Sequence, residues 1–417
     1  MLMLGTAKRC ITPPAPVRMC GYATRTEAFE AVIEDIWVRV HHFHNSNIQL
    51  TIVYADLLWW NTDFIARIRT ELEKTLGMPS NSVLFVASHN HSGPGTGNCF
   101  TPLLETGDAA YSDFLTYQII EAIKAAQSNV EQVTVRRFGT QCDMNVYRRV
   151  QTENGIQMWP NYSVPADHHL TVLGFYRLDE SLKGTMIHYP CHANLSNKNF
   201  IQPDYPGITL RMLDEAFPNS LSVFLQGCTA DLRPNSVLGN RFIPCDYARV
   251  LVFAQNFFEC CKELLVEDGV QLESALGISK LSIELPLEQN FDRDSVNNAL
   301  KASDEATRQW AEKILEKDLR PYETMEITRV VLAGQTLFTF NAEVSQFYAA
   351  YARTICPGAI CVGYANGMIG YIPTSVQIGE GGYEPKDSTT YFALAGSFSP
   401  KIEELIHEAI DNLIKLK

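Results

Sequence analysis

The run SVLFVAS at residues 82–88 is the part of the sequence that most limits the possible folds. It is short and apolar without alternation, which is typical of a strand buried on both faces of its sheet. Such a sheet needs helices packed over it, as in α/β proteins. Strand-like and helix-like segments alternate along the rest of the chain, so we predict an α/β fold in which helices cover mixed β-sheets.

The coarse pattern of the chain supports this fold class. Segments rich in β-branched and aromatic residues predict strands at 37–43, 50–60, 134–142, 170–178, 185–190, 222–227 and 328–343. Helices are predicted at 62–76, 108–127, 294–319 and 400–416, the last with Ser399 as its cap, Pro400 in its first turn and one apolar stripe. No repeat or long linker divides the chain, so we expect residues 1–417 to form a single domain, of one or two lobes.

Composition excludes several classes of protein. Apolar residues make up 46% of the chain and charged residues 19%, as in ordinary globular proteins. The formal charge of −13 argues against nucleic-acid binding, which needs a basic surface. No apolar run is long enough for a transmembrane segment, and no signal peptide is evident. The 11 cysteines include no CxxC pair and indicate a reducing compartment, so we expect a cytoplasmic protein.

Two histidines, His89 and His91, follow the apolar strand. In an extended segment, residues two apart point to the same face, so both imidazoles would enter one cavity at the end of the strand. The loop SGPGTG at 92–97 would leave backbone N–H groups free to face a developing oxyanion. The alternative is a pair of histidines hydrogen-bonded to backbone. The glycine-rich loop favours the functional interpretation.

Three further strand-to-loop transitions carry polar side chains, some of which can bind a metal. They supply the imidazoles His188 and His192, the pair Asp231 and Arg233, and Glu343. Each has a structural explanation as well: a satisfied buried histidine, or a carboxylate that favours a helix dipole. Taken together, two histidines and a glutamate match a catalytic zinc site, in which about three protein ligands leave one position open.

Several motifs, in the same order, resemble those of the neutral (non-lysosomal) ceramidase family. ASHNHSGPGTG is similar to the family's SHTHSGPGG, ITPPAPVRMCGYA to its ITPP…MGYA, NVYRRV to its NINRSP and HYPCHANLS to its THPTSMS. QGCTADLRPN is similar to QSNAGDVSPN, FNAEVSQFYAAYAR to PGEFTTMAGRR, and YANGMIGYIPT…GGYE to NVYTHYITT…QRYE. The resemblance covers most of the chain and implies the fold of that family's N-terminal catalytic domain.

The resemblance also implies residue roles. It implies a zinc ion held by His89, His192, Glu343 and Tyr371. It implies a catalytic set in which His91 handles a proton beside the reacting water, Arg148 binds the scissile carbonyl oxygen, Tyr383 lines the cavity, and Asp231 and Arg233 stand in the segment similar to the family's DVSPN.

The chain departs from the family pattern in two ways. Arg233 stands where the family carries a serine important for activity, which suggests an anionic or strongly polar substrate group nearby. We also expect neither the secretory signal nor the C-terminal immunoglobulin-like domain of characterised ceramidases. Both departures favour a polar substrate over ceramide.

These residues predict a zinc-dependent amidohydrolase that cleaves a lipid or small-molecule N-acyl bond with a metal-activated water. Zinc can lower the pKa of bound water from about 15.7 to about 7. Proton transfer by a side chain such as His91 typically adds about 10²- to 10⁴-fold, so the metal dominates. One alternative is hydrolysis of a small polar N-acyl or O-acyl compound at the same centre. Another is a non-catalytic binding protein on this scaffold, which the complete set of metal-competent residues argues against.

Overall fold

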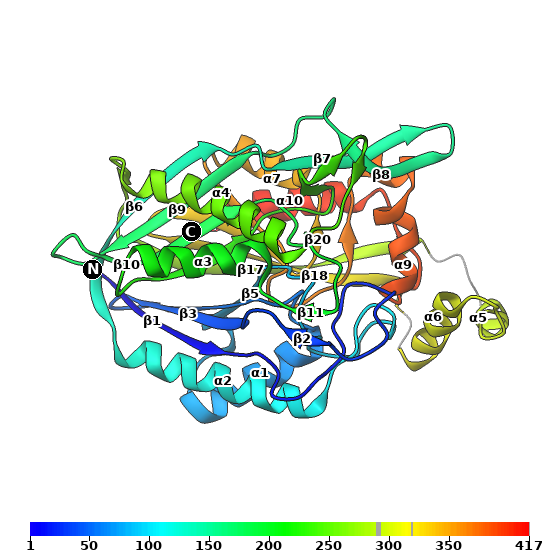
Figure 1. The fold of residues 1–417 in the computed structure, drawn as a ribbon, viewed down its shortest axis with the longest axis horizontal. Helices are drawn as coiled ribbons and strands as arrows, with labels where there is room; N and C mark the ends of the chain where they lie inside the picture. Colours follow the sequence, from blue (N-terminus) through cyan, green and yellow to red (C-terminus); the bar gives the residue numbers. More distant parts are fainter. Residues whose placement is uncertain (289–292, 318–319, 417) are drawn as a thin grey trace.

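In a computed structural model, which describes residues 1–288, 293–317 and 320–416, mixed sheets are covered by helices (Figure 1). The largest sheet has nine strands. Across the sheet they are β12 (Leu221–Gln226), β10 (Leu182–Tyr189), β9 (His169–Tyr176), β6 (Glu131–Gln141), β1 (Leu2–Cys10), β3 (Trp37–His44), β4 (Gln49–Ala55) and β5 (Val83–Ala87), with β16 (Val270–Gln271) paired to β6. The pairs β4–β5 and β10–β12 are parallel and the others antiparallel. The predicted α/β class with mixed sheets is confirmed.

The two edges of this sheet lie close to each other. Strand β12, at one edge, contacts β3, β4 and β5, at the other edge. The loop after β5 and the loop after β10 therefore meet, although about a hundred residues separate them in the sequence. This curvature of the sheet brings the histidine motifs together.

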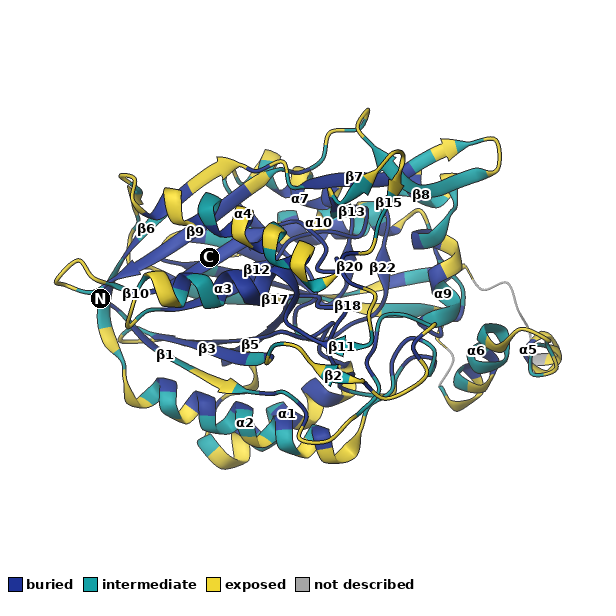
Figure 2. Cartoon of the chain, in the orientation of Figure 1, coloured by how far each residue is buried: buried dark blue, intermediate teal, exposed yellow. Residues whose placement is uncertain are grey.

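Helices cover the sheet. They are α1 (Thr62–Leu76), α2 (Ala109–Ser128), α3 (Asp204–Ala216) and α4 (Tyr247–Leu265). Helix α2 packs on β1 and β3, while α3 packs on α4 and β12, and the outward faces of these helices are the exposed ones (Figure 2). The helices predicted at 62–76 and 108–127 are confirmed: Asn61 and Asp108 cap their first turns, and Gly77 ends α1 in the left-handed conformation.

A second sheet of five strands lies in the C-terminal part. In order, its strands are β21 (Ile360–Val362), β19 (Gln335–Phe340), β18 (Tyr322–Leu332), β17 (Leu276–Glu288) and β23 (Ser397–Phe398). The single strand predicted at 328–343 is wrong, because Ala333 and Gly334, at φ 55° and 82°, turn the chain into the β18–β19 hairpin. The strand predicted at 50–60 ends at Ala55.

Helix α10 (Ile402–Lys415) packs on β17, β18 and α7 (Gln346–Ile355). Its predicted apolar stripe is confirmed: Ile402, Ile406, Ala409, Ile410 and Leu413 are buried. The predicted cap is wrong. Lys401 occupies the N-cap position without a side-chain bond, and Ser399 contributes its backbone carbonyl to the Ile402 N–H.

Shorter elements complete the fold. A three-stranded sheet joins β13 (Leu232–Pro234), β7 (Asn145–Thr152) and β8 (Gly155–Asn161), and pairs form between β20 (Glu343–Val344) and β22 (Tyr371–Ile372), β2 (Ala31–Val32) and β11 (Phe200–Ile201), and β14 (Val237–Leu238) and β15 (Arg241–Phe242). Short helical segments are a 3₁₀ turn (Ser80–Ser82), α8 (Ser375–Glu380), a π-helix (Tyr383–Asp387) and α9 (Ser388–Tyr391).

The helix predicted at 294–319 is two helices, α5 (Arg293–Ala299) and α6 (Glu305–Glu316), which lie at one end of the molecule (Figure 1). Asp304 begins α6 by accepting a bond from the Thr307 N–H, and this new cap divides the segment. Residues 318–319 of the prediction lie outside the described residues.

Alternation along the strands divides the buried apolar residues between two cores. On β4, Ile52 and Tyr54 belong to one core, and Val53 and Ala55 to the other. Both faces of the strand are therefore covered, as the unbroken apolar runs predict. Among the described helices, none combines the length and apolarity needed to cross a membrane.

Candidate metal centre

His89 and His91 lie in the loop that follows β5, a strand whose five residues are all buried. The extended conformation predicted for this segment is wrong, because His89 has φ 62° and turns the chain at the end of the strand. A left-handed conformation in a residue other than glycine is strained, and such residues concentrate at functional sites. Hydrogen bonds from Asn90 N–H to the Leu57 carbonyl and from His91 N–H to the Ala193 carbonyl hold the turn.

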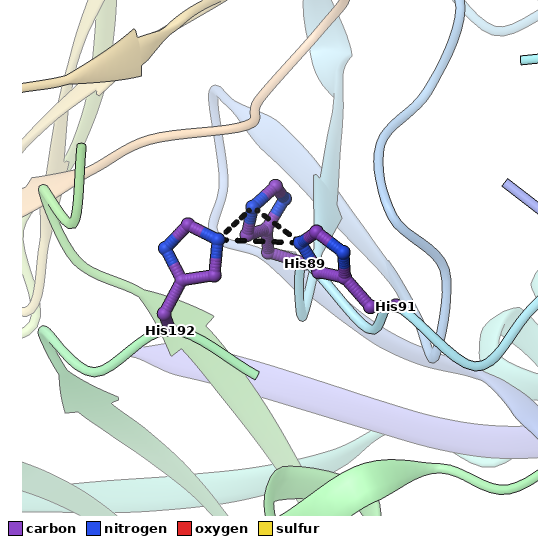
Figure 3. A group of neighbouring side chains, drawn as sticks. All are labelled: His89, His91 and His192. Carbon is purple, nitrogen blue, oxygen red and sulfur yellow. Dashed lines mark hydrogen bonds between the residues drawn. The ribbon is translucent and has the colours of Figure 1, made fainter. Parts of the chain in front are cut away.

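The loop after β10 supplies His192, while His188 lies elsewhere. His188 remains within β10, where its Nε2 bonds the Cys361 carbonyl at 2.9 Å. His192 follows Pro190, which ends the strand, and its ring turns towards His89 and His91 (Figure 3). The structure therefore separates two imidazoles that the sequence left equivalent.

The Nε2 atoms of the three histidines converge. His89 and His192 are 2.9 Å apart, His91 and His192 3.2 Å, and His89 and His91 3.3 Å, measured between Nε2 atoms (Figure 3). All three side chains are buried. Donors bound tetrahedrally to zinc at about 2.0–2.1 Å lie about 3.3 Å from one another. Among the described residues, these three form a group that could hold a metal ion.

Backbone carbonyls fix the tautomers of two of these rings. The Nδ1 atoms of His89 and His192 lie 3.0 Å from the Leu58 carbonyl and 3.3 Å from the Thr229 carbonyl. A carbonyl only accepts, so each Nδ1 carries the hydrogen and each Nε2 presents a lone pair. Two lone pairs 2.9 Å apart repel each other unless a cation or proton lies between them. This arrangement fits a metal ion.

Burial keeps the rings uncharged. Desolvation lowers the pKa of His89 to about 3, and it lowers the pKa values of His91 and His192 well below the ordinary histidine value. The positive charges of Arg148 and Arg233 act in the same direction on His91 and His192. Neutral imidazole is the form that binds metals.

Glu343 adds a carboxylate beside two of the histidines. Its Oε2 lies 3.5 Å from His89 Nε2, and its Oε1 lies 3.7 Å from His192 Nδ1. Oε1 is buried and has no hydrogen-bond partner. Desolvation raises the pKa of Glu343 to about 8, although Arg148 and the Tyr371 and Tyr364 hydroxyls oppose that shift. An unpartnered buried carboxylate oxygen needs a proton or a cation.

Strand pairing places Tyr371 beside Glu343. The two residues are direct partners in the parallel pair β20–β22. Tyr371 is buried, its ring centroid lies 5.5 Å from that of Tyr383, and burial raises the pKa of its phenol well above the ordinary value. The Arg148 guanidinium lies 5.6 Å from the Tyr371 ring. Tyr371, Tyr383 and Arg148 therefore adjoin one another next to Glu343.

Arg148 is a buried cation with one free donor. Its Nε donates to Glu384 Oε1 at 2.8 Å, and its backbone N–H donates to the Asp231 carbonyl. Its Nη2 is buried without a partner. A free guanidinium N–H can bind the carbonyl oxygen of a substrate.

Asp231 performs a structural task next to the site. Its carboxylate accepts bonds from Ser345 Oγ at 2.6 Å, Gln346 N–H at 2.9 Å and Gln377 Nε2 at 2.8 Å. These donors lie at the start of α7 and in α8. In the described part of the chain, no hydrogen bond or ion pair joins Asp231 to the three histidines. Asp231 therefore fixes the segment that carries Glu343.

Three backbone N–H groups of the glycine-rich loop after His91 already have acceptors within the protein. Thr96 and Gly97 N–H both donate to Glu105 Oε1, and Ser92 N–H donates to Asn90 Oδ1. The prediction that these N–H groups face an oxyanion is therefore wrong for these three residues. The glycines serve close packing instead, since a Cβ on Gly97 would lie 2.3 Å from the Asn61 side chain.

An N-terminal loop that spacing did not identify supports His91. Arg25 donates through Nη2 to the His91 carbonyl, and the Tyr22 and His91 rings lie 5.0 Å apart. Gly21 has φ 89°, and a Cβ there would lie 2.6 Å from His91 Nδ1. The Tyr364 ring stacks on the His89 ring, with 4.0 Å between the centroids. The loop that carries Gly21, Tyr22 and Arg25 is about seventy residues from His91 in the sequence. The MCGYA motif was the one sequence feature that indicated a role for it.

Comparisons with known proteins identify the fold. The sequence matches no family model and no curated protein. Its fold matches the neutral ceramidase from Pseudomonas aeruginosa with a TM-score of 0.77 at 17% identity, over 99% of this chain and 74% of that chain. A ceramidase complexed with C2 matches with a TM-score of 0.77 at 16% identity, over the same shares. At this identity the likeness establishes a shared fold, and it confirms the neutral-ceramidase-like catalytic fold that the motifs predict.

Proposed function

We propose that the protein is a zinc-dependent hydrolase that cleaves an N-acyl (amide) bond and that residues 1–417 form one catalytic domain. The observation that carries the proposal is the convergence of three neutral imidazole nitrogens within 3.3 Å of one another. The shared fold with proteins named ceramidases supports amide hydrolysis as the reaction.

His89, His91 and His192 are the nitrogen donors in this proposal, and Glu343 is the oxygen donor through Oε2. The resemblance places His91 beside the ion, but its Nε2 is as near to the other two nitrogens as a ligand would be. Tyr371, which the resemblance implies as a ligand, instead favours the charged form of Glu343 through its hydroxyl, which partly opposes the rise in the Glu343 pKa caused by desolvation. Zinc, when bound, supplies a Lewis acid that makes water a nucleophile near neutral pH.

The chain's own residues then bind the substrate and move the proton. Arg148 Nη2 binds the acyl oxygen, and Glu343 Oε1, which has no other partner, holds the proton lost by water. Hydrolysis breaks the carbon–nitrogen bond, leaves the oxygen of water on the acyl carbon and passes that proton to the departing amine. Tyr371, Tyr383 and Phe392 are in ring contact and exclude bulk water from this side.

A second candidate is hydrolysis of a small polar N-acyl or O-acyl compound by the same centre. Arg233 favours it, because a half-buried guanidinium suits a polar substrate group better than a lipid tail. We also propose a cytoplasmic location, which the eleven free thiols support.

The test is to measure zinc and hydrolysis together. We expect about one zinc per chain by elemental analysis, loss of hydrolysis with a chelator and recovery with zinc. The substrate panel contains ceramide, N-acyl amino acids and p-nitrophenyl acetate, so that lipid amides, polar amides and esters are compared. Bound zinc at a thousand times its Kd should stabilise the fold by about 4 kcal/mol and raise the unfolding temperature. Protein that binds no zinc after its addition would refute the proposal.

A further inference from the structure

Arg233 and Arg148 lie on the same face of the small sheet β13–β7–β8. In the antiparallel register, Arg233 is the direct partner of Val146, and Leu232 is the partner of Tyr147. Direct partners point to the same face, and so do residues two apart on one strand. Arg233 and Arg148 are therefore diagonal neighbours on the face from which Arg148 reaches Glu384 and the Tyr371 ring.

The two arginines differ in how their charge is balanced. Arg148 and Arg149 both pair with Glu384, and Arg149 also pairs with Glu380. Arg233 forms no ion pair with any carboxylate in the described residues. Its Nη1 lies 3.7 Å from the Met158 sulfur, its guanidinium lies 4.8 Å from the Phe242 ring centroid, and its Nε is buried without a hydrogen-bond partner.

Arg233 also lies next to the histidines. The carbonyl of Asn194, two residues after His192, accepts a bond from the Tyr22 hydroxyl, and the Tyr22 ring is in contact with His91. A small surface hollow lies at this position and is lined by Asn194, Leu195, Arg233, Pro234, Ser236, Phe242 and Ile243. Arg233 thus lines a hollow that it shares with Asn194 and Leu195, in the loop that carries His192.

A half-buried cation without an anionic partner is costly, and the cost falls when an anion binds it. The planar guanidinium offers parallel N–H groups that match the two oxygens of a carboxylate. The molecule as a whole carries −13, so this local positive charge is not a general property of its surface. It marks one position for an anion.

We propose that Arg233 binds a carboxylate on the amine side of the substrate, which makes the substrate class N-acyl amino acids or closely related N-acyl acids. This inference rests on the proposed function, because it places the carboxylate relative to the amide bond cleaved at the metal centre. It goes beyond that function by naming the group that the site selects.

The experiment compares acids with their neutral amides. The zinc-loaded protein is assayed with N-acetylglycine and N-lauroylglycine, each beside its carboxamide, so that both acyl lengths are covered. Wild-type kcat/KM should favour the acids by about 10- to 100-fold, the range of a charge-assisted hydrogen bond. Arg233→Gln should remove this preference mainly through a higher KM for the acids, and Arg233→Lys should retain part of it. Arg241→Gln is the matched control, because Arg241 also lies over an aromatic ring, Trp159, at 3.8 Å, but is exposed.

A second measurement separates this inference from the proposed function. Calorimetric binding of N-lauroylglycine and its carboxamide to chelator-treated protein reports recognition without turnover. Hydrolysis of acids and amides at equal rates would overturn the carboxylate assignment and leave the hydrolase intact. Preferential binding of the acid that disappears in Arg233→Gln, without any turnover by zinc-loaded protein, would support the carboxylate site and refute the hydrolase. No preference in either measurement would overturn the inference.

Discussion

Replacing Gly21 by alanine should disturb the metal centre from a position that binds no metal. Gly21 contacts the back of the His91 ring: an added Cβ would lie 2.6 Å from Nδ1 and 3.2 Å from Cε1. Carbon and nitrogen atoms cannot approach so closely, so the ring must move. Its Nε2 points at the other histidines, and a shift of a few tenths of an ångström displaces a proposed ligand.

Gly21→Ala has two effects, backbone strain and the contact with His91, and the same substitution at a second glycine distinguishes them. Alanine at φ 89° is strained by about 1–2 kcal/mol, whatever its neighbours. Gly155, the first residue of β8 after the β7–β8 turn, has φ 84° and nothing within 4 Å of an added Cβ. Gly155→Ala therefore carries the same backbone strain without the contact to His91. Disturbance of a group that orients a ligand typically lowers metal affinity about 10- to 100-fold.

The assay is a zinc titration in competition with a chromophoric chelator, with the unfolding temperature of each variant measured in parallel. Both variants should unfold at slightly lower temperature than the wild type. Only Gly21→Ala should lose zinc affinity, by about 10- to 100-fold. Equal zinc affinity in the two variants would show that the contact with His91 does not control the centre, and the reasoning would fail.

Three other substitutions distinguish residues near the site by their roles. His192→Gln should abolish zinc binding at micromolar concentration, whereas His188→Gln should leave the zinc titration unchanged, because His188 Nε2 bonds only the Cys361 carbonyl; a loss of zinc in His188→Gln would contradict the assignment. Asp231→Ala leaves three donors at the start of α7 and in α8 without an acceptor, which should lower the free energy of unfolding by about 1–3 kcal/mol or more. Because Asp231 fixes the segment that carries Glu343, zinc affinity should fall with stability, by about 10-fold. Denaturant unfolding and a zinc titration of Asp231→Ala check this prediction. Unchanged stability with loss of zinc binding would show that Asp231 belongs to the metal centre.

Capping residues and hydrophobic patterns in the sequence predicted many of the helices and strands, and the strand-to-loop transitions that carry polar side chains. The helix predicted at 62–76 has those bounds, because Asn61 and Gly77 provide the capping groups that the sequence displays. The β18–β19 turn was missed because Ala333 stands at a left-handed position where glycine or asparagine is usual. Strand β1 was also missed. Its Gly5 interrupts the apolar pattern, yet a Cβ there would lie 1.9 Å from the Ala126 carbonyl, so only glycine lets α2 pack this closely.

Contacts between residues far apart in the sequence determine which histidines join the cluster and which tautomers they adopt, and local sequence patterns do not predict either. The sequence does not distinguish His188 from His192. In the structure, His188 Nε2 is hydrogen-bonded to the Cys361 carbonyl, whereas His192 bonds the Thr229 carbonyl through Nδ1 and leaves its Nε2 free to face the other histidines. The tautomers of the cluster likewise depend on carbonyls of Leu58 and Thr229, which lie in loops after β4 and β12. Those partners follow from the approach of the two sheet edges, a property of the whole fold.

The histidine pair shows how a correct prediction can come from a wrong backbone. Along a regular strand, residues two apart are displaced by about 6.6 Å and point to the same face, a spacing from which two imidazoles can reach one ion. In the structure His89 has a left-handed backbone instead, and the Nε2 atoms of His89 and His91 lie 3.3 Å apart. The Tyr364 ring stacked on His89 and the Leu58 carbonyl bonded to it hold that conformation. His89 and His91 therefore converge through a turn held by distant parts of the chain, and not through the strand alternation that the sequence predicts.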